Sequence, residues 1–318
     1  MDFSTAAVLV GVSVLGVSSY FDFRTREVEN YITVGFIVLA AVMQLGFSLF
    51  TGNFAFLQNA LLVGGLFFAF GWVMFQTGQW GGADTKLLAG MGVLFANFAP
   101  VAPWPFAATL FVNIFLSAFA YTILYSVYLT WQEPSVISEF QKSVRSDSAE
   151  LLRVFALVAF AVFAASGYVF WRFSPDFFTL ILFLEPLFSL LVLVPVFWGL
   201  VKFARALENK TLRLKATGKT LREFDLLTVD ILRIGKKVSA VPESESTKAM
   251  RRSAKEVIYD STDPNGLTLE QIAGIQKLVK SRALPDSFVV KWGLPFVPVF
   301  LIAVVMTLYF GDIVIRFI

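Results

Sequence analysis

Eight apolar segments, each close to the length of a membrane-spanning helix, dominate this sequence of 318 residues. A helix that crosses a bilayer needs about 20 mostly apolar residues. We therefore expect an all-α polytopic membrane protein with about eight transmembrane helices. Six or seven is the alternative if one segment is re-entrant or lies in the interface. The segments are 3–21, 31–50, 55–76, 85–98, 104–131, 151–171, 177–201 and 293–313.

The composition supports an integral membrane protein that contacts the lipid bilayer. Hydrophobic residues make up 57% of the chain and charged residues 15%, whereas soluble domains average about 45–50% and 25%. The net charge of +3 does not predict nucleic-acid binding, because in a membrane protein the placement of Lys and Arg matters more than their sum. The N-terminal sequence MDFSTAAVLV has no basic region, so we expect the first span to be retained rather than cleaved.

One segment near the C-terminus is polar and predicts a small soluble cytoplasmic domain inserted before the last helix. Within it, Thr268 and Gln271 have the spacing of a capping box that opens a helix, whereas the stretch 205–239 is compatible with either an α/β or a helical unit. The expected organisation is a five-span core at 1–131, a cytoplasmic loop at 132–150, an additional transmembrane hairpin at 151–201, the soluble domain at 202–292 and the last helix at 293–318.

The basic residues predict the orientation, because Lys and Arg are enriched in short cytoplasmic loops. With the N-terminus outside, only Arg172 and Arg316 fall on the outer side. Six basic residues fall in the short cytoplasmic segments: Arg24, Arg26, Lys86, Lys142, Arg145 and Arg153. We therefore expect a plasma-membrane protein with both termini outside and the soluble domain in the cytoplasm.

The chain contains no His and no Cys, which restricts the chemistry available to it. Thiol nucleophiles, Ser-His-Asp triads and metal sites built from His or Cys are excluded, and we expect no metal and no cofactor. Acid–base chemistry must use other side chains. Asp22 closes the first span, Asp84 and Lys86 open the fourth, and Glu185 lies within the seventh.

Asp22 and Asp84 are predicted to lie at the same depth. The first span runs inward and the fourth runs outward, so both carboxylates reach the cytoplasmic membrane face. Two close carboxylates cannot both ionise and share one proton, as in an aspartic-protease dyad. The charged member activates water, and the protonated member polarises the scissile carbonyl and then protonates the leaving amine.

The stretch GQWGGADTKLLAGMG surrounds the second acid. Gly81, Gly82 and Ala83 leave little side-chain bulk before Asp84, so a substrate backbone has room to approach. Ordinary roles compete with catalytic ones, because an Asp at a span end is commonly a helix cap. Arg24, Arg26 and Lys86 are interpreted as anchors of the positive-inside type. Arg24, Lys86 and Asn30 are also candidates for binding the substrate or shaping the site. Glu185 is a candidate polar lining.

Both acidic segments resemble the signatures of type IV prepilin peptidases. Residues 22–30, DFRTREVEN, resemble the first signature, an Asp followed by a basic residue and ending in a hydrophobic-x-Asn pattern that closes at Asn30. Residues 81–86, GGADTK, resemble the GxGD-type second signature, and Ala83 fits the archaeal preflagellin (pre-archaellin) peptidases. The tail from Lys291 to Pro298 looks like the start of the last span in archaeal members.

The resemblance implies a membrane aspartic endopeptidase that removes the short basic leader, of the class III type, from pilin-like or archaellin precursors. Asp22 and Asp84 would be its catalytic pair, and Glu27 and Glu29 could attract the basic leader. The bacterial enzymes also methylate the new N-terminus, but this chain lacks their cysteines and a GxGxxG-like cofactor loop. We therefore expect no methyltransferase activity. The identity of the precursor and the oligomeric state are not predicted.

Two other functions stay open at this point. A proton- or cation-coupled transporter would use Asp22, Asp84 and Glu185 as an ion path, and would need acids at several depths or inverted repeats. An intramembrane protease of the presenilin or signal-peptide-peptidase kind would cut within the membrane. Its Pro-Ala-Leu element is only loosely matched by residues 283–285 and 294–295.

Overall fold

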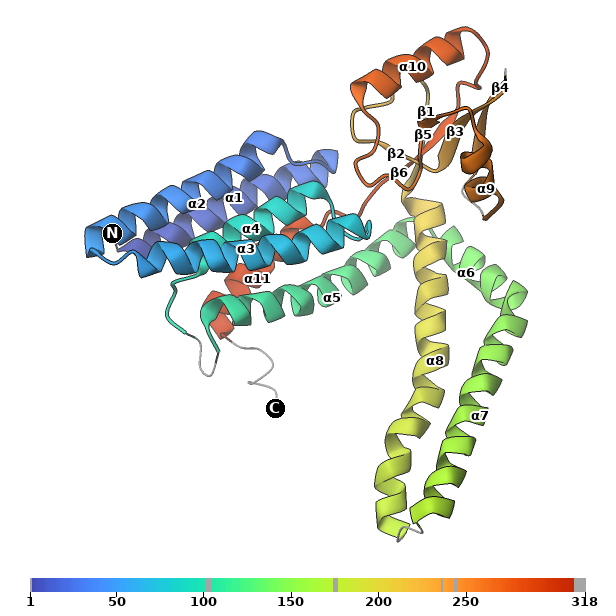
Figure 1. Cartoon of the computed structure of the whole chain (residues 1–318), viewed down its shortest axis with the longest axis horizontal. Coiled ribbons are helices and arrows are strands. Elements are labelled where there is room, and N and C mark those ends of the chain that lie inside the picture. Colours follow the sequence, from blue (N-terminus) through green and yellow to red (C-terminus); the bar gives the residue numbers. More distant parts are fainter. Residues whose placement is uncertain (1, 101–103, 174–176, 236, 243–244, 312–318) are drawn as a thin grey trace. The chain divides into compact units, whose positions relative to one another are not determined.

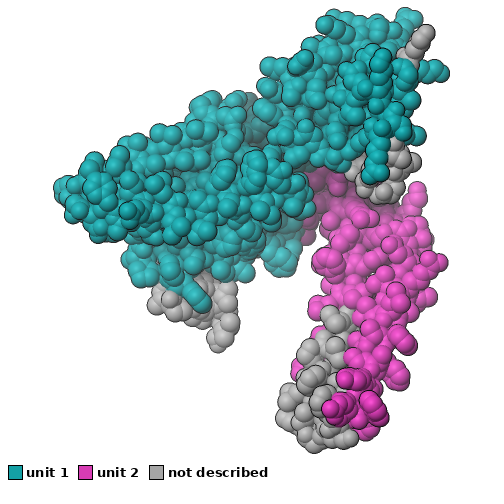
Figure 2. Space-filling model, viewed as in Figure 1, with its two compact units in different colours: residues 1–124, 214–318 teal, residues 125–213 magenta. Residues whose placement is uncertain are grey.

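A computed structural model describes residues 2–100, 104–173, 177–235, 237–242 and 245–311 of the chain. It divides into two compact units, 1–124 with 214–318, and 125–213 (Figure 2). Among the described residues, five helices are long and apolar enough to cross a membrane. This architecture is that of a multi-pass membrane protein.

All eight predicted apolar segments contain a helix (Figure 1). The end of the eighth predicted span, 312–313, and Arg316 lie outside the described residues. The helices are α1 (Phe3–Thr25), α2 (Asn30–Thr51), α3 (Ala55–Gln76), α4 (Gly82–Phe95), α5 (Phe106–Gln132), α7 (Ser148–Phe173), α8 (Phe177–Thr211) and α11 (Val297–Phe310). The five that qualify as spans by length and hydropathy are α1, α2, α3, α5 and α7.

The helix α4 lies in the centre of the first unit and packs against α1, α2 and α3. From Asp84 to Phe95 every side chain except Lys86 is buried. Glycine permits this close packing, because a Cβ on Gly90 would lie 2.4 Å from the ring of Phe36.

The two central helices, α4 and α11, are short. Each has 14 residues and is therefore about 21 Å long, less than the roughly 30 Å of a hydrocarbon core. Polar side chains cover the end of α4: the amide of Gln44 donates to the carbonyls of Val93 and Leu94, both at 3.0 Å, and Asn97 donates to Gln44 at 3.0 Å. These bonds satisfy carbonyls that no water would reach inside a bilayer.

The inserted domain contains strands, so the expected all-α class is wrong for this part of the chain, and the open choice for 205–239 is decided in favour of an α/β unit. The strands form two three-stranded sheets in the orders β1-β6-β2 and β4-β3-β5. The strands are β1 (Arg213–Ala216), β2 (Leu226–Leu227), β3 (Val229–Ile234), β4 (Lys237–Pro242), β5 (Glu256–Tyr259) and β6 (Phe288–Lys291). β-branched residues such as Val229, Ile231 and Val238 favour these strands.

Two helices, α9 (Glu245–Ser253) and α10 (Leu269–Lys280), accompany the sheets. The capping box predicted at the start of α10 is confirmed. The backbone N–H of Gln271 donates to the Thr268 hydroxyl at 3.2 Å, and the N–H of Thr268 donates to the Gln271 side chain at 2.9 Å. Tyr259 and Ile275 lie in the core of the inserted domain, which is separate from that of the helices.

The second unit contains α7 and α8, joined at their base to α6 (Ser135–Ser146). The segment 132–150, which we expected to be a loop, therefore includes a helix. It is stable because it is amphipathic: Val136 is buried, and Phe140 packs against Phe203 of α8. Lys202 of α8 is buried and forms an ion pair with Asp147. Many apolar side chains of α7 and α8 are exposed, as in helices that face lipid.

Candidate active site

The carboxylate of Asp22 lies in the last turn of α1 and is 7% exposed. Its Oδ2 accepts a hydrogen bond from the backbone N–H of Val297, at 2.9 Å. The helix ends immediately afterwards, since Arg26 adopts the left-handed conformation (φ 60°) and its N–H donates to the carbonyl of Asp22. The side chain of Asp22 is thus fixed between the end of α1 and the start of α11.

Asp84 lies in the first turn of α4 and is 9% exposed. Its Oδ2 accepts the backbone N–H of Gly81 at 2.9 Å, as an acid at the third helical position does when it caps a helix start. Asp84 therefore has an ordinary structural role. That role accounts for one of its carboxylate oxygens.

Helices α1 and α4 pack against each other, and the buried carboxylates of Asp22 and Asp84 interact electrostatically. The structure thus brings together the end of α1 and the start of α4, the two ends that the sequence predicts to lie at one depth. Asp22 and Asp84 each accept a backbone N–H and are both almost inaccessible to solvent. A pair of oriented, buried carboxylates can provide a general base and a general acid for hydrolysis.

The three small residues before Asp84 differ in their surroundings. A Cβ on Gly81 would lie 3.2 Å from Oδ2 of Asp84, whereas a Cβ on Gly82 would meet only the ring of Phe75, at 3.7 Å. Ala83 packs against the hydrophobic core. Space beside the carboxylate therefore depends on Gly81, and the Ala83 methyl group belongs to the core.

Two predicted site residues connect the motifs directly. The ammonium of Lys86, at the start of α4, donates a hydrogen bond to Oδ1 of Asn30, the first residue of α2, at 2.5 Å. Arg24 is exposed and donates to the Tyr20 hydroxyl of its own helix at 2.7 Å. The hydrogen bond between Lys86 and Asn30 thus links the starts of α4 and α2 next to the two acids.

The loop between α1 and α2 carries the two acids proposed to face a basic leader. Glu27 and Glu29 are exposed. Partial burial raises the pKa of Glu27, and the nearby carboxylate of Asp225 raises it further, while the Arg222 guanidinium opposes both. Arg222 and Asp225 belong to the inserted domain. No local sequence signal pointed to them, because only the fold brings residue 27 near residue 225.

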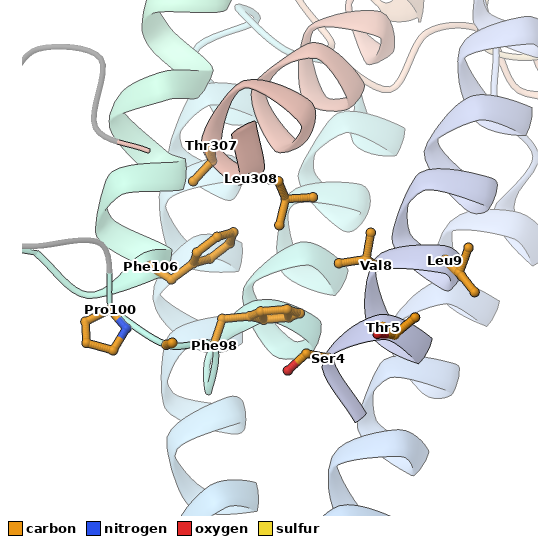
Figure 3. A pocket seen from close by; sticks show the side chains of 10 residues that line it. Ser4, Thr5, Val8, Leu9, Phe98, Pro100, Phe106, Thr307 and Leu308 are labelled. Carbon is orange, nitrogen blue, oxygen red and sulfur yellow. The ribbon is translucent and has the colours of Figure 1, made fainter. Parts of the chain in front are cut away.

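Glu185 and a pocket are two further features of the chain. Glu185 is exposed on α8, in the second unit. A pocket of about 560 Å³ lies at the opposite ends of the same helices, lined by Ser4 and Thr5 of α1, Phe98 after α4, and Thr307 of α11 (Figure 3). Since Asp22 is 18 positions after Ser4 (22 − 4) on α1, about 27 Å along the helix, this pocket does not contain the carboxylates.

Comparison with known proteins supports the resemblance of the acidic motifs. Residues 9–126 match the sequence model of the type IV leader peptidase family. This segment contains both aspartates and five of the helices, α1 to α5, in whole or in part. The resemblance predicted from residues 22–30 and 81–86 is therefore confirmed for this part of the chain.

Two curated relatives are both preflagellin peptidases. The protein of Methanococcus voltae is 37% identical over 93 residues, which is 29% of this chain and 40% of the relative. The protein of Methanococcus maripaludis (strain C6 / ATCC BAA-1332) is 32% identical over 90 residues, 28% of this chain and 39% of the relative. This chain thus covers about two fifths of each relative's length. No solved structure matches this chain.

Proposed function

We propose that this protein is a membrane aspartic endopeptidase that removes the short basic leader from pilin-like or archaellin precursors. The observation that carries the proposal is the pair of buried, electrostatically interacting carboxylates of Asp22 and Asp84, within a segment that matches the type IV leader peptidase family. The preflagellin peptidase names of both relatives point to archaellin precursors as the first substrates to test.

In the proposed mechanism, one carboxylate of the dyad removes a proton from a water molecule, which attacks the carbonyl carbon of the scissile peptide bond. The second member of the dyad, which is protonated, donates a hydrogen bond to the carbonyl oxygen as negative charge develops there. The tetrahedral intermediate then collapses, the C–N bond breaks, and this acid transfers its proton to the leaving amine. The water supplies the hydroxyl group of the new carboxyl terminus.

We further propose eight spans, with the N-terminus outside and both the dyad and the inserted domain in the cytoplasm at the plasma membrane. The scissile bond then lies where the apolar helix of the precursor emerges from the lipid bilayer. Glu27 and Glu29, exposed beside the site, attract the basic leader. Reversing both charges with Lys should raise KM for a leader peptide while kcat is retained; an unchanged KM would remove these residues from the proposal.

The test is cleavage of a purified archaellin precursor by the full-length protein in detergent or liposomes. We expect Asp22→Asn and Asp84→Asn each to abolish cleavage. Both variants should still insert in membranes and have the same size-exclusion elution volume as the unmodified protein. Glu270→Gln, which changes an exposed acid of α10, is the matched control and should retain activity. Processing by either Asn variant would exclude the dyad.

The position of the cut distinguishes the proposal from a presenilin-like activity. Mass spectrometry of the products should place the cut at the junction between the leader and the apolar helix. A cut deep within the apolar helix would favour the intramembrane protease instead. Ion flux through liposomes that depends on Asp84, without proteolysis, would favour a transporter.

A further inference from the structure

The segment 292–300, which joins strand β6 to the first turn of α11, contacts the first acidic motif and Trp80, the residue directly before the second. We propose that this segment is a brace that sets the position of Asp22 relative to Asp84. The catalytic consequence of the brace rests on the peptidase function proposed above, whereas its mechanical role does not. The brace makes contact at three places, through Val297, through Phe296 together with Phe300, and through Trp292.

The first contact is the hydrogen bond from the Val297 N–H to the carboxylate of Asp22, at 2.9 Å. Val297 is the first residue of α11, and the first amides of a helix have no partner within it. Pro298 has no N–H to offer, and the N–H of Val299 donates to the carbonyl of Phe296 at 2.9 Å. The start of α11 thus directs the Val297 N–H to Asp22, where the positive end of the helix dipole also favours a carboxylate.

The second contact joins the brace to Trp80, directly before the other motif. The ring of Phe296 lies 5.2 Å from that of Trp80, and Phe300 lies 5.9 Å from Trp80 at an interplanar angle of 78°. Trp80 directly precedes Gly81, whose N–H binds Asp84. A displacement of the first turn of α11 would therefore move both the partner of Asp22 and the backbone that holds Asp84.

The third contact lies at the end of α1. The guanidinium of Arg26 lies over the ring of Trp292, 5.6 Å from its centre. Arg26 caps the helix whose last turn carries Asp22. Cation–aromatic contacts of this kind stabilise a fixed approach of two segments. Three contacts from one short segment thus reach the end of α1 and the turn before α4.

The mechanical role can be measured without any cleavage assay. The chain has no cysteine, so spin labels attach only where Phe23→Cys and Gln79→Cys are introduced, at exposed positions close to each acid. We expect one narrow distance distribution between the labels. Phe296→Ala should broaden or shift it, whereas Phe310→Ala, the same change at the other end of α11, should leave it unchanged. If Phe296→Ala and Phe310→Ala give the same distance distribution, residues 292–300 do not set the position of Asp22 relative to Asp84.

The catalytic consequence needs a backbone change, because the donor is a main-chain N–H. Replacing Val297 by its α-hydroxy analogue puts an ester oxygen in place of that N–H and keeps the side chain. We expect kcat to fall by roughly ten- to a hundredfold, the loss of one hydrogen bond to a charged group, with KM unchanged. The same ester at Val305 is the control and should retain kcat.

The two experiments separate the brace from the peptidase. Equal kcat values for the two esters, or a change in KM alone, would overturn the role of Val297 in positioning Asp22. If the unmodified protein cleaves no precursor, the proposed function fails, and the label distances still decide whether residues 292–300 hold the two motifs together.

Discussion

Lys86 and Asn30 are joined by a hydrogen bond of 2.5 Å between Nζ and Oδ1. Asn30 ends the first acidic motif and Lys86 ends the second, so the bond connects the two motifs across 56 positions of sequence. From sequence, Lys86 is interpreted as a positively charged membrane anchor and as a candidate site-shaping residue. In the structure it also ties the start of α4 to the start of α2.

This bond predicts coupling between the two positions. Lys86→Met and Asn30→Ala should each lower kcat/KM by roughly two- to tenfold, as expected for one hydrogen bond near the surface. The double variant should have a kcat/KM no lower than that of the more damaging single variant, because both changes remove the same contact. Steady-state cleavage kinetics provide the measurement. Lys142→Met, at an exposed position on α6, is the control, and additive losses in the double variant would contradict the coupling.

Packing around α4 predicts a steric effect at Gly90. Its added Cβ would lie 2.4 Å from the ring of Phe36, which is 1% exposed and has little room to move. Gly90→Ala should therefore lower the stability by about 1–3 kcal/mol, the usual cost of overpacking a core. Thermal unfolding in detergent measures this loss.

Two further variants test the cause. Phe36→Leu combined with Gly90→Ala should regain part of the stability, because the smaller side chain relieves the clash. Gly65→Ala changes a helical glycine with no neighbour within 4 Å of the added Cβ and should cause no loss. Equal melting temperatures for Gly90→Ala and Gly65→Ala would show that the close contact with Phe36 does not lower the stability of the Gly90→Ala variant.

A buried ion pair predicts the sensitivity of the inserted domain. Asp230 is fully buried and accepts hydrogen bonds from Arg251 and Ser261. Asp230→Asn leaves Arg251 without its charge partner on β3 and should cost about 3 kcal/mol. Glu256→Gln, which removes an exposed partner of Arg233, should cost less than about 1 kcal/mol. Hydrogen exchange of the β3 and β5 amides in the full-length protein measures the stability loss in each variant. Equal losses in Asp230→Asn and Glu256→Gln would contradict the role of burial.

The same residue predicts a dependence on pH. Burial alone would raise the pKa of Asp230, but the hydrogen bonds from Arg251 and Ser261 outweigh it and hold this pKa below the ordinary value of 3.8. A lowered pKa means that the unfolded state binds the proton more tightly. The stabilisation is therefore present above about pH 4 and is lost as the pH falls through the folded-state pKa. Exchange protection that stays constant on acidification, or falls equally in Asp230→Asn, would contradict this.

Much of the helical part follows from sequence, because the signals are local. Runs of apolar residues fix where helices form in a bilayer, and each of the eight predicted segments contains one. The inserted domain was harder to predict, since short strands such as β2, with two residues, depend on partners far away in sequence. The helix α6 was missed because its apolar positions are few and are separated by polar ones.

The amino-acid sequence by itself determined the membrane class, the polar insertion and the choice of two acids, which it predicts to lie at one membrane face. These features depend on composition, on local runs and on span direction. Only the tertiary structure decided what holds the acids: the donor to Asp22 is a backbone N–H 275 positions away, at Val297. Every non-proline residue carries such a group, so a sequence cannot single one out, and only the packing of α11 against α1 places it beside the carboxylate.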